Sequence, residues 1–295
     1  MESGRERALV LHGGGSAGNA WEIGVVAGLF DGGLDVAKAD LIVGTSAGST
    51  AAAQITGAPS TELFAAILSA ATPQRAGEGA RAPIGPMAGH METTTRIIAS
   101  AVSAADMRRK MGAAALELDA GSDGSAQKQW RSVASSRLPS QHWPEQRLLI
   151  TAVDARTGEP VVFDRDSGVD LVDAVAASTS IGFGVPPYPI GDSHYIDGGY
   201  RRNENADLAA GYARVLVLSP FGGRSRHPAE WGMQLAAQVD ELRAGGSRVE
   251  TVFPDGESLK AFGDNMMDLS RRPASAQAGY HQGRALAEQL AGFWR

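Results

Sequence analysis

The residues best placed to do chemistry form the segment GTSAG at 44–48, which follows a short apolar run. A serine between two glycines at a strand-to-helix transition sits on a sharp turn that exposes its hydroxyl group. The following helix directs its positive dipole end toward Ser46, which favours negative charge developing there. We therefore predict that Ser46 is a nucleophile and that Gly44 and Gly48 shape its turn. The pattern alone also fits a small-residue helix start, with Thr45 or Ser46 as the N-cap.

A second glycine-rich segment, GGGSAG at 13–18, follows the first apolar run of the chain. Glycines leave backbone N–H groups accessible, and two N–H groups aimed at one point form an oxyanion hole, in which each donor contributes roughly 3–4 kcal/mol. We predict this role for Gly13, Gly14 and Gly15. A plain tight turn is one alternative. Dinucleotide binding is another, because Gly13, Gly15 and Gly18 fit its fingerprint, although no acidic residue ends the second strand.

A third segment, Asp197-Gly198-Gly199, follows a strand-like run and places a carboxylate at a strand end. Asp-Gly is also a common turn, so this segment alone predicts no chemistry. Two other kinds of partner for Ser46 remain open. A Ser-His-Asp triad would use one of the histidines that follow, His227 or His281. The rival carboxylates are expected in turns or solvated loops; they are Asp154, Asp164, Asp166 and Asp192.

Together the three segments resemble the patatin-like phospholipase family. In that family a glycine-rich oxyanion loop follows the first strand, G-x-S-x-G follows the second, and D-G-[GA] supplies the second member of a Ser–Asp dyad. The three motifs occur here in the same order, and the resemblance extends over most of the chain, including TAVD at 151–154 and RNENA at 202–206. Ala17 departs from the pattern, because many members carry Arg or Lys there. Ser46 also comes too soon after Gly15 for an α/β-hydrolase sheet.

The resemblance implies a lipid acyl hydrolase that needs no metal or organic cofactor. Ser46 would attack an ester carbonyl, Asp197 would accept its proton without a histidine, and Gly13, Gly14 and Gly15 would stabilise the oxyanion. The implied substrate is a phospholipid, a lysophospholipid or another acyl ester. A catalytically silent module that binds a nucleotide or a lipid is the alternative from another functional class.

Placing these segments together requires a particular arrangement of strands and helices. Apolar runs at 8–11 and 41–43 alternate with helical patterns at 20–30 and 46–55, which predicts a βαβ start and a parallel sheet. We expect a three-layer αβα sandwich with a mostly parallel central sheet. It would form one domain over 1–295, with a helical insertion or cap over 60–145 that contains a loop at 71–86. Further strands are predicted at 147–153, 160–163, 194–196, 214–218 and 249–253, and further helices at 93–118, 130–138, 169–178, 231–243 and 275–294.

Composition narrows the remaining classes of function. The chain has 295 residues, a formal net charge of −6 and no cysteine. The mildly acidic balance argues against nucleic acid as a partner, and the missing cysteines exclude disulfides and thiolate catalysis. No apolar run approaches the roughly 18 residues of a membrane span, and the short charged start does not read as a signal peptide. We therefore expect a cytoplasmic protein, with transient contact at a membrane surface left open.

Overall fold

The structure, a computed structural model, describes residues 5–70, 87–182 and 184–295. Within these ranges the core element is an eight-stranded sheet with the order β5-β6-β3-β2-β1-β7-β8, and β4 pairs with β3 outside that path. The strands are β1 Arg7–Leu11, β2 Leu41–Gly44, β3 Arg147–Asp154, β4 Pro160–Phe163, β5 Tyr188–Ile190, β6 Ser193–Asp197, β7 Arg214–Leu218 and β8 Arg248–Val252.

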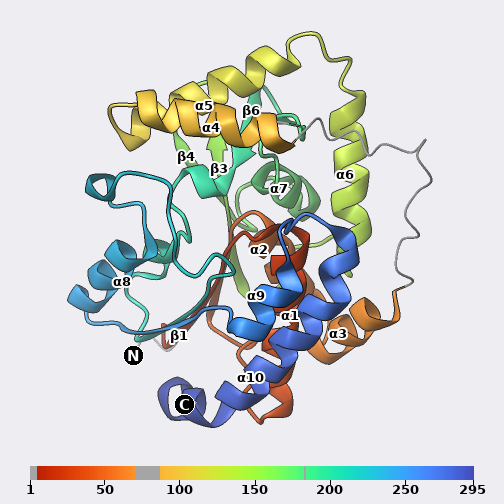
Figure 1. Cartoon of the computed structure of the whole chain (residues 1–295), viewed down its shortest axis with the longest axis vertical. Helices are drawn as coiled ribbons and strands as arrows, with labels where there is room; N and C mark the ends of the chain where they lie inside the picture. Colours follow the sequence, from red (N-terminus) through yellow and green to blue (C-terminus); the bar gives the residue numbers. More distant parts are fainter. Residues whose placement is uncertain (1–4, 71–86, 183) are drawn as a thin grey trace.

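Helices cover both faces of this sheet (Figure 1). The longer helices are α1 Gly15–Asp31, α2 Ala47–Gly57, α3 Ser60–Ser69, α4 Met87–Ser100, α5 Ala104–Asp119, α6 Ser125–Arg137, α7 Leu171–Ser178, α8 Leu235–Ala244, α9 Gly256–Phe262 and α10 Arg272–Trp294. Short 3-10 turns are η1 Gly198–Tyr200, η2 Ala206–Ala209, η3 Ala229–Trp231 and η4 Leu269–Arg271.

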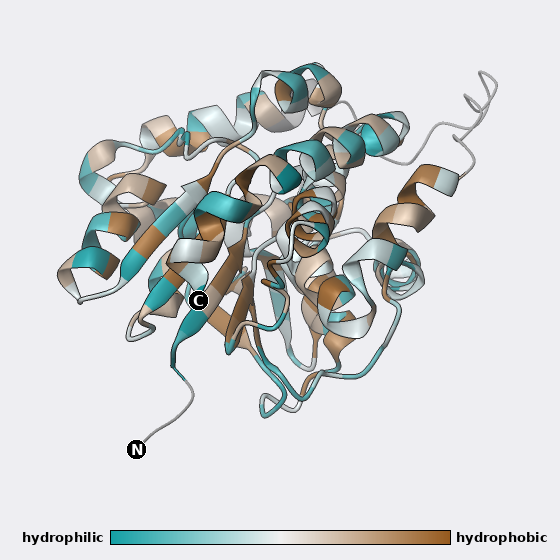
Figure 2. Ribbon diagram, turned by 90° about the horizontal axis from the view of Figure 1, so that it is seen from below, coloured by the Kyte–Doolittle hydropathy of each residue, from teal (hydrophilic) through white to brown (hydrophobic). Residues whose placement is uncertain are grey.

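The five strands β3, β2, β1, β7 and β8 run parallel, and β4, β5 and β6 are antiparallel to their neighbours. Parallel strands are buried on both faces, so their sequences read as continuous apolar runs rather than as alternating patterns. Strand β1 shows this directly: Leu9 and Leu11 face the cluster of α1, α2, α7 and α10, and Ala8 and Val10 face the cluster of α8. The apolar strands are visible as brown ribbons in Figure 2. The expected αβα sandwich with a mostly parallel sheet is confirmed.

The helices α4 and α5 pack against the end of β3 and β6 (Figure 1) through a third apolar cluster. Met107 and Met111 are fully buried in this cluster, beside Val153 and Ile196 of the strands. One helix over 93–118 was expected, and this prediction was wrong. The helix is interrupted between α4 and α5, where the Ser103 hydroxyl accepts a hydrogen bond from the Asp106 N–H as the N-cap of α5.

The stretch 60–145, which was expected to form a helical insertion or cap, is described in part. The described part of this stretch consists of α3, α4, α5 and α6, and the loop expected at 71–86 lies outside the described residues. One domain over 1–295 with a cap over 60–145 remains a prediction. Among the described helices, none is both long and apolar enough to cross a bilayer.

Candidate active site

Ser46 lies on a strained turn between β2 and α2. Its backbone has φ 53° and ψ −125°, a conformation that costs a residue with a side chain about 1–3 kcal/mol. The flanking glycines make the turn sterically feasible. A Cβ atom on Gly44 would lie 2.6 Å from the Ser49 Cα, and one on Gly48 would lie 2.2 Å from the Leu11 carbonyl oxygen. The predicted shaping role of both glycines thus has a steric basis.

Hydrogen bonds hold the Ser46 backbone in this conformation. The Ser46 N–H donates to the Ser178 hydroxyl at 3.0 Å, and the Ser49 hydroxyl donates to the Ser46 carbonyl at 2.6 Å. Ser178 is the last residue of α7, so a helix far along the chain holds the turn that carries Ser46. The Ser46 side chain is thereby presented at the N-terminus of α2, where the helix dipole favours an anion.

Asp197 ends β6 and is buried, with an exposed fraction of 6%. Its N–H donates to the Ser180 carbonyl at 2.7 Å, and its carboxylate accepts the Gly199 N–H at 2.8 Å. Burial raises the pKa of Asp197 to about 6, against the opposing effects of a hydrogen bond from the Ser46 hydroxyl and of the Gly199 N–H. Ser46 and Asp197, which are 151 positions apart in sequence, therefore meet as a hydroxyl–carboxylate pair.

Sheet register explains why these two residues meet. Strand β4 pairs with β3 along one edge, from Ile150 to Val153. A strand has two edges, so β2 and β6 both pair with the other edge of β3, one after the other. Strand β2 leaves that edge at Gly44, which pairs with Ile150, and β6 enters from the opposite direction with Asp197 paired to Ala152. Two residues of strand correspond to about 6.7 Å. The end of β2 and the end of β6 thus face one another across a short gap.

A buried polar network lies behind the pair. The hydroxyl groups of Thr45 and Thr151 are 3.0 Å apart. The Asn205 side-chain N–H₂ lies 2.9 Å from the Thr45 hydroxyl, 3.2 Å from the Thr151 hydroxyl and 3.0 Å from the Gly198 carbonyl. Asn205 therefore joins the turn before Ser46 to the turn after Asp197.

Sequence reasoning did not single out Asn205 or Ser178 as site residues. Asn205 lies within the RNENA segment, and its left-handed backbone, with φ 57°, is one that asparagine tolerates better than most residues. An asparagine that shortly follows an Asp-Gly turn was the available signal. No local sequence pattern predicts a contact between Ser178 and Ser46, because this contact depends on how the end of α7 packs against the turn that carries Ser46.

The glycine-rich loop lies directly beside Ser46. A Cβ atom on Gly13 would be 2.8 Å from the Ser46 Cβ and 3.2 Å from its Oγ. Gly14 is held against Pro220, and Gly15 has φ +60° and lies against the Met266–Met267 backbone and side chain. In the described part of the chain, the N–H groups of Gly13, Gly14 and Gly15 have no backbone acceptor. Three amides are thus free to donate next to the hydroxyl, at the start of α1.

The alternative partners lie elsewhere. His227 contacts the Ser225 hydroxyl and the Trp231 ring, and His281 contacts Gln277 on α10. Within the described residues, neither histidine hydrogen-bonds to Ser46 or Asp197. Asp154 and Asp164 cap their own turns, as expected, and Asp166 and Asp192 are exposed.

The dinucleotide alternative lacks its acidic residue. Asp40 precedes β2 and accepts the Glu6 and Arg7 amides at the opposite end of the strand from Ser46. A ribose at the carboxyl end of the sheet would therefore find no carboxylate supplied by the second strand. In the described residues, no cluster of three or more His, Asp or Glu side chains is arranged to hold a metal ion.

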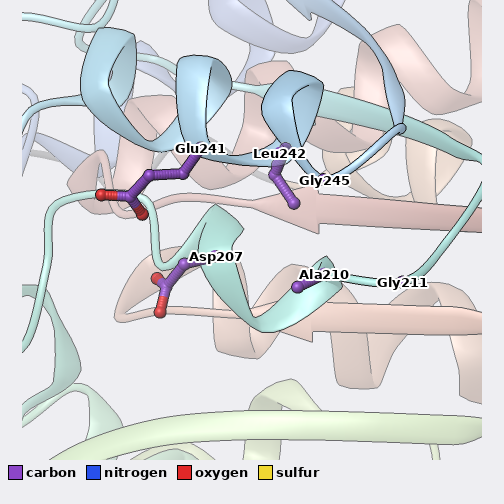
Figure 3. A pocket seen from close by; sticks show the side chains of 6 residues that line it. All are labelled: Asp207, Ala210, Gly211, Glu241, Leu242 and Gly245. Carbon is purple, nitrogen blue, oxygen red and sulfur yellow. The ribbon is translucent and has the colours of Figure 1, made fainter.

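A small pocket between α8 and η2 does not include the site (Figure 3). It has a volume of about 80 Å³, and Asp207 and Glu241 line it. Both carboxylates are already paired, Asp207 with Arg201 and Glu241 with Arg202. We therefore interpret this pocket as a packing gap beside two ion pairs.

Several known proteins are similar to this chain. Two solved structures are similar to this chain at low identity. One is VipD from Legionella pneumophila, at 13% identity and TM-score 0.44, covering 97% of this chain and 67% of VipD. The other is the type III effector protein ExoU, at 16% identity and TM-score 0.38, covering 95% of this chain.

The chain spans about half, 54%, of the ExoU chain. No curated protein matches the sequence. The model of the family described as patatin-like phospholipase matches residues 9–210, which is more than half of the chain and includes all three motifs. This protein belongs to the patatin-like phospholipase family.

Proposed function

We propose that this protein hydrolyses acyl esters of lipids, with Ser46 as nucleophile and Asp197 as its general base. Family membership supports a lipid hydrolase, and the site geometry supports the mechanism. The observation that supports it is the placement of the buried Asp197 carboxylate close enough to Ser46 for the hydroxyl to lower the pKa of Asp197, with Gly13 packed against the same serine side chain. A nucleophile, a base and free amides are the three parts that acyl transfer requires.

Acylation begins when the Ser46 oxygen attacks the ester carbonyl carbon and its proton passes to the Asp197 carboxylate. The carbonyl oxygen becomes an oxyanion, which the N–H groups of Gly13, Gly14 and Gly15 stabilise by hydrogen bonds. The helix dipoles at the starts of α1 and α2 add to this stabilisation. The ester C–O bond then breaks, and the leaving alcohol takes the proton from Asp197. Ser46 is left as an acyl ester.

Deacylation repeats these steps with water. Asp197 accepts a proton from a water molecule, the hydroxide oxygen attacks the acyl carbon, and a second oxyanion forms in the same loop. When the bond to the Ser46 oxygen breaks, the proton returns from Asp197 to that oxygen. The fatty acid leaves, and the enzyme regains its starting protonation state. The proposed steps use no cofactor.

The environment of Asp197 suits this role. An aspartate in water has a pKa near 3.9 and is a weak base at neutral pH. Burial raises the pKa of Asp197 to about 6, which brings it close to the pH at which a general base works best. The Gly199 N–H bond orients the carboxylate without abolishing this effect. A histidine is therefore not required to carry the proton.

Exposed apolar side chains border the glycine loop and support transient contact with a lipid surface. Phe221 is 38% exposed and follows Pro220, which packs on Gly14. Met267 is 37% exposed and its sulfur lies against Gly15. We propose that these two side chains enter the lipid surface when the substrate is drawn from an aggregate.

The function is tested by hydrolysis of a panel of acyl esters by the wild type, Ser46→Ala and Asp197→Asn. The panel pairs soluble nitrophenyl esters of several chain lengths with phospholipids and lysophospholipids. We expect turnover by the wild type and a fall of at least about 10³-fold in each variant. Asp192→Asn removes an exposed carboxylate from the same hairpin and should keep full activity. Near-normal turnover by Asp197→Asn would overturn the dyad, and turnover by Ser46→Ala would overturn the nucleophile.

A further inference from the structure

A groove of about 250 Å³ lies among helices α1, α2 and α3, where α6 ends and α10 begins. Leu63, Ala66 and Ala70 give it an accessible apolar wall, and the lining residues Ile23 and Ile67 are buried. Arg137 and Arg272 give it two positive charges, and neither Ser46 nor Asp197 lines it. The groove is therefore amphiphilic and separate from the hydroxyl–carboxylate pair.

The two arginines are not neutralised by the part of the chain that the structure describes. The guanidinium of Arg272 donates from one nitrogen to the Ser16 carbonyl at 3.1 Å and the Asn19 side-chain oxygen at 2.9 Å. The Arg137 guanidinium lies 5.4 Å from the centre of the Trp130 ring. Neither arginine forms an ion pair with a described carboxylate, whereas Arg131, Arg201 and Arg202 all do. The groove thus has spare donors and uncompensated charge.

The surroundings of Arg137 and Arg272 disfavour the charged form of both side chains. Partial burial, with a further contribution from repulsion by Arg137, lowers the pKa of Arg272 to about 10. Burial also lowers the pKa of Arg137. Arg137 remains substantially solvent-exposed, so water still screens part of the effect. Two like charges that face one groove, with no described carboxylate paired to either, are relieved by an anion bound between them.

We propose that this groove binds the phosphate monoester of an anionic lipid between Arg137 and Arg272. A phosphate monoester carries nearly two charges at neutral pH and three acceptor oxygens, which match two guanidinium groups with free donors. The alkyl part of the lipid would lie along Leu63, Ala66 and Ala70, which are the accessible apolar residues of the groove. Free phosphate would leave this apolar wall exposed to water, and a lipid covers it.

The groove is connected to the active-site loops without being part of them. Asn19 accepts from Arg272, and its side-chain N–H₂ donates to Gln54 at 3.0 Å and approaches the Ala47 carbonyl at 3.5 Å. Ala47 follows Ser46, and Ser16 follows the three glycines of the loop. Gln54 in turn donates to the Arg137 carbonyl at 3.0 Å. A lipid bound to both arginines would therefore brace the segments that carry the nucleophile and the amides.

Titration calorimetry with the full chain carrying Ser46→Ala tests the site without hydrolysis, so its outcome does not depend on the proposed activity. The probe is dihexanoyl phosphatidic acid below its aggregation concentration. Dihexanoyl phosphatidylcholine has the same chains without the monoester, and inorganic phosphate has the anion without the chains. We expect saturable binding of the phosphatidic acid, with binding at least tenfold weaker for each of the other two.

Two arginine variants locate the binding. Arg137→Gln and Arg272→Gln should each weaken phosphatidic acid binding by about tenfold or more, as expected for the loss of a charge-assisted hydrogen bond. Arg137 lies near the surface, so its variant is informative even where Arg272→Gln does not fold. Arg284→Gln makes the same charge change on α10, outside the groove, and should bind as the parent does.

Three results would overturn the proposal. Absence of saturable binding, or binding unchanged in both arginine variants, would show that the groove is not a phosphate site. Equal affinity for inorganic phosphate would show that the apolar wall holds no lipid. Equal affinity for phosphatidylcholine would show that the two arginines do not select the monoester.

Discussion

At the scale of single residues, the proposed chemistry depends on one carboxyl group, Asp197, whose burial raises its pKa. Among the described residues, the Asp197 carboxylate accepts the Gly199 amide, and the nearby Ser46 hydroxyl also lowers its pKa. Removing water from around a carboxylate disfavours its charged form, and these two donors offset only part of that effect. A buried residue with few partners therefore acquires a pKa near neutrality, where it can both accept and return a proton.

The first prediction concerns the pH dependence of turnover. Because Asp197 must be ionised to accept the Ser46 proton, kcat/KM should rise about tenfold per pH unit below pH 6 and level off above it. A soluble nitrophenyl ester, measured from pH 4 to 8, gives the profile without an interface. A midpoint near 4 would mean that Asp197 is not the base or is not desolvated.

The second prediction concerns stability and follows from the same raised pKa. A folded-state pKa of about 6 against an ordinary value of 3.8 means that folding favours the protonated form. That stabilisation is fully present below about pH 4 and is lost as the pH rises through about 6. The loss is about 3 kcal/mol, because one pKa unit corresponds to about 1.4 kcal/mol.

Asp197→Asn keeps an oxygen for the Gly199 N–H and cannot ionise. Its unfolding free energy relative to the wild type should therefore increase between pH 4 and 7, by up to about 3 kcal/mol. Urea unfolding at several pH values measures this difference, with Asp192→Asn as the control. A constant difference across this range would mean that Asp197 is not desolvated in the folded protein.

At the scale of elements, three parts of the fold converge on Ser46. Strand β2 ends beside it, β6 brings Asp197 along the same edge of β3, and the end of α7 holds its amide through Ser178. The strained φ of 53° is sustained by these contacts together with the flanking glycines. We therefore propose Ser178 as a positioning residue, whose effect should be visible in turnover more than in binding.

The third prediction tests Ser178. Replacing it by alanine leaves the Ser46 N–H without its acceptor, so the turn should relax and kcat should fall about tenfold, corresponding to about 1.4 kcal/mol. KM should change little, since Ser178 does not face the solvent. Ser178→Thr keeps the hydroxyl and should recover most of the activity. Equal losses in kcat for both variants, or an effect on KM alone, would contradict the positioning role.

The same elements show which features can be read from sequence. The turns at Ser46 and Asp197 are predictable because glycines at fixed offsets mark them, and the apolar runs reveal the parallel strands. The antiparallel return of β6 beside β2 leaves no local signal, because register is set by pairing with β3. Ser178 and Asn205 act through contacts between distant segments. The break between α4 and α5 was missed because helical periodicity continues across Ser103.

At the scale of the whole molecule, exposed apolar side chains lie beside the glycine loop of the candidate active site. Phe221 and Met267 flank the glycine loop and are each more than one third exposed. Burying such side chains in lipid is favourable by about 25 cal/mol per Å² of apolar surface. A protein of net charge −6 gains little from electrostatic attraction to anionic membranes, so this apolar contribution would dominate docking.

The fourth prediction separates docking from chemistry. Phe221→Ser combined with Met267→Ser should lower hydrolysis of phospholipid vesicles by at least about fivefold, because each change removes apolar area from the docking surface. Hydrolysis of a soluble ester should stay within about twofold, since neither side chain supplies a reacting group. Leu118→Ser, which removes a 70% exposed leucine from α5, is the matched control. Parallel losses on vesicles and soluble ester would contradict a docking role.

The central claim, that the Ser46 hydroxyl is the nucleophile activated by Asp197, is tested most directly by covalent labelling with a fluorophosphonate and mass spectrometry of the labelled peptide. The account predicts one adduct, on Ser46, with labelling abolished in Ser46→Ala and slowed at least about 10²-fold in Asp197→Asn. An adduct on any other residue, or unchanged labelling in Asp197→Asn, would contradict it.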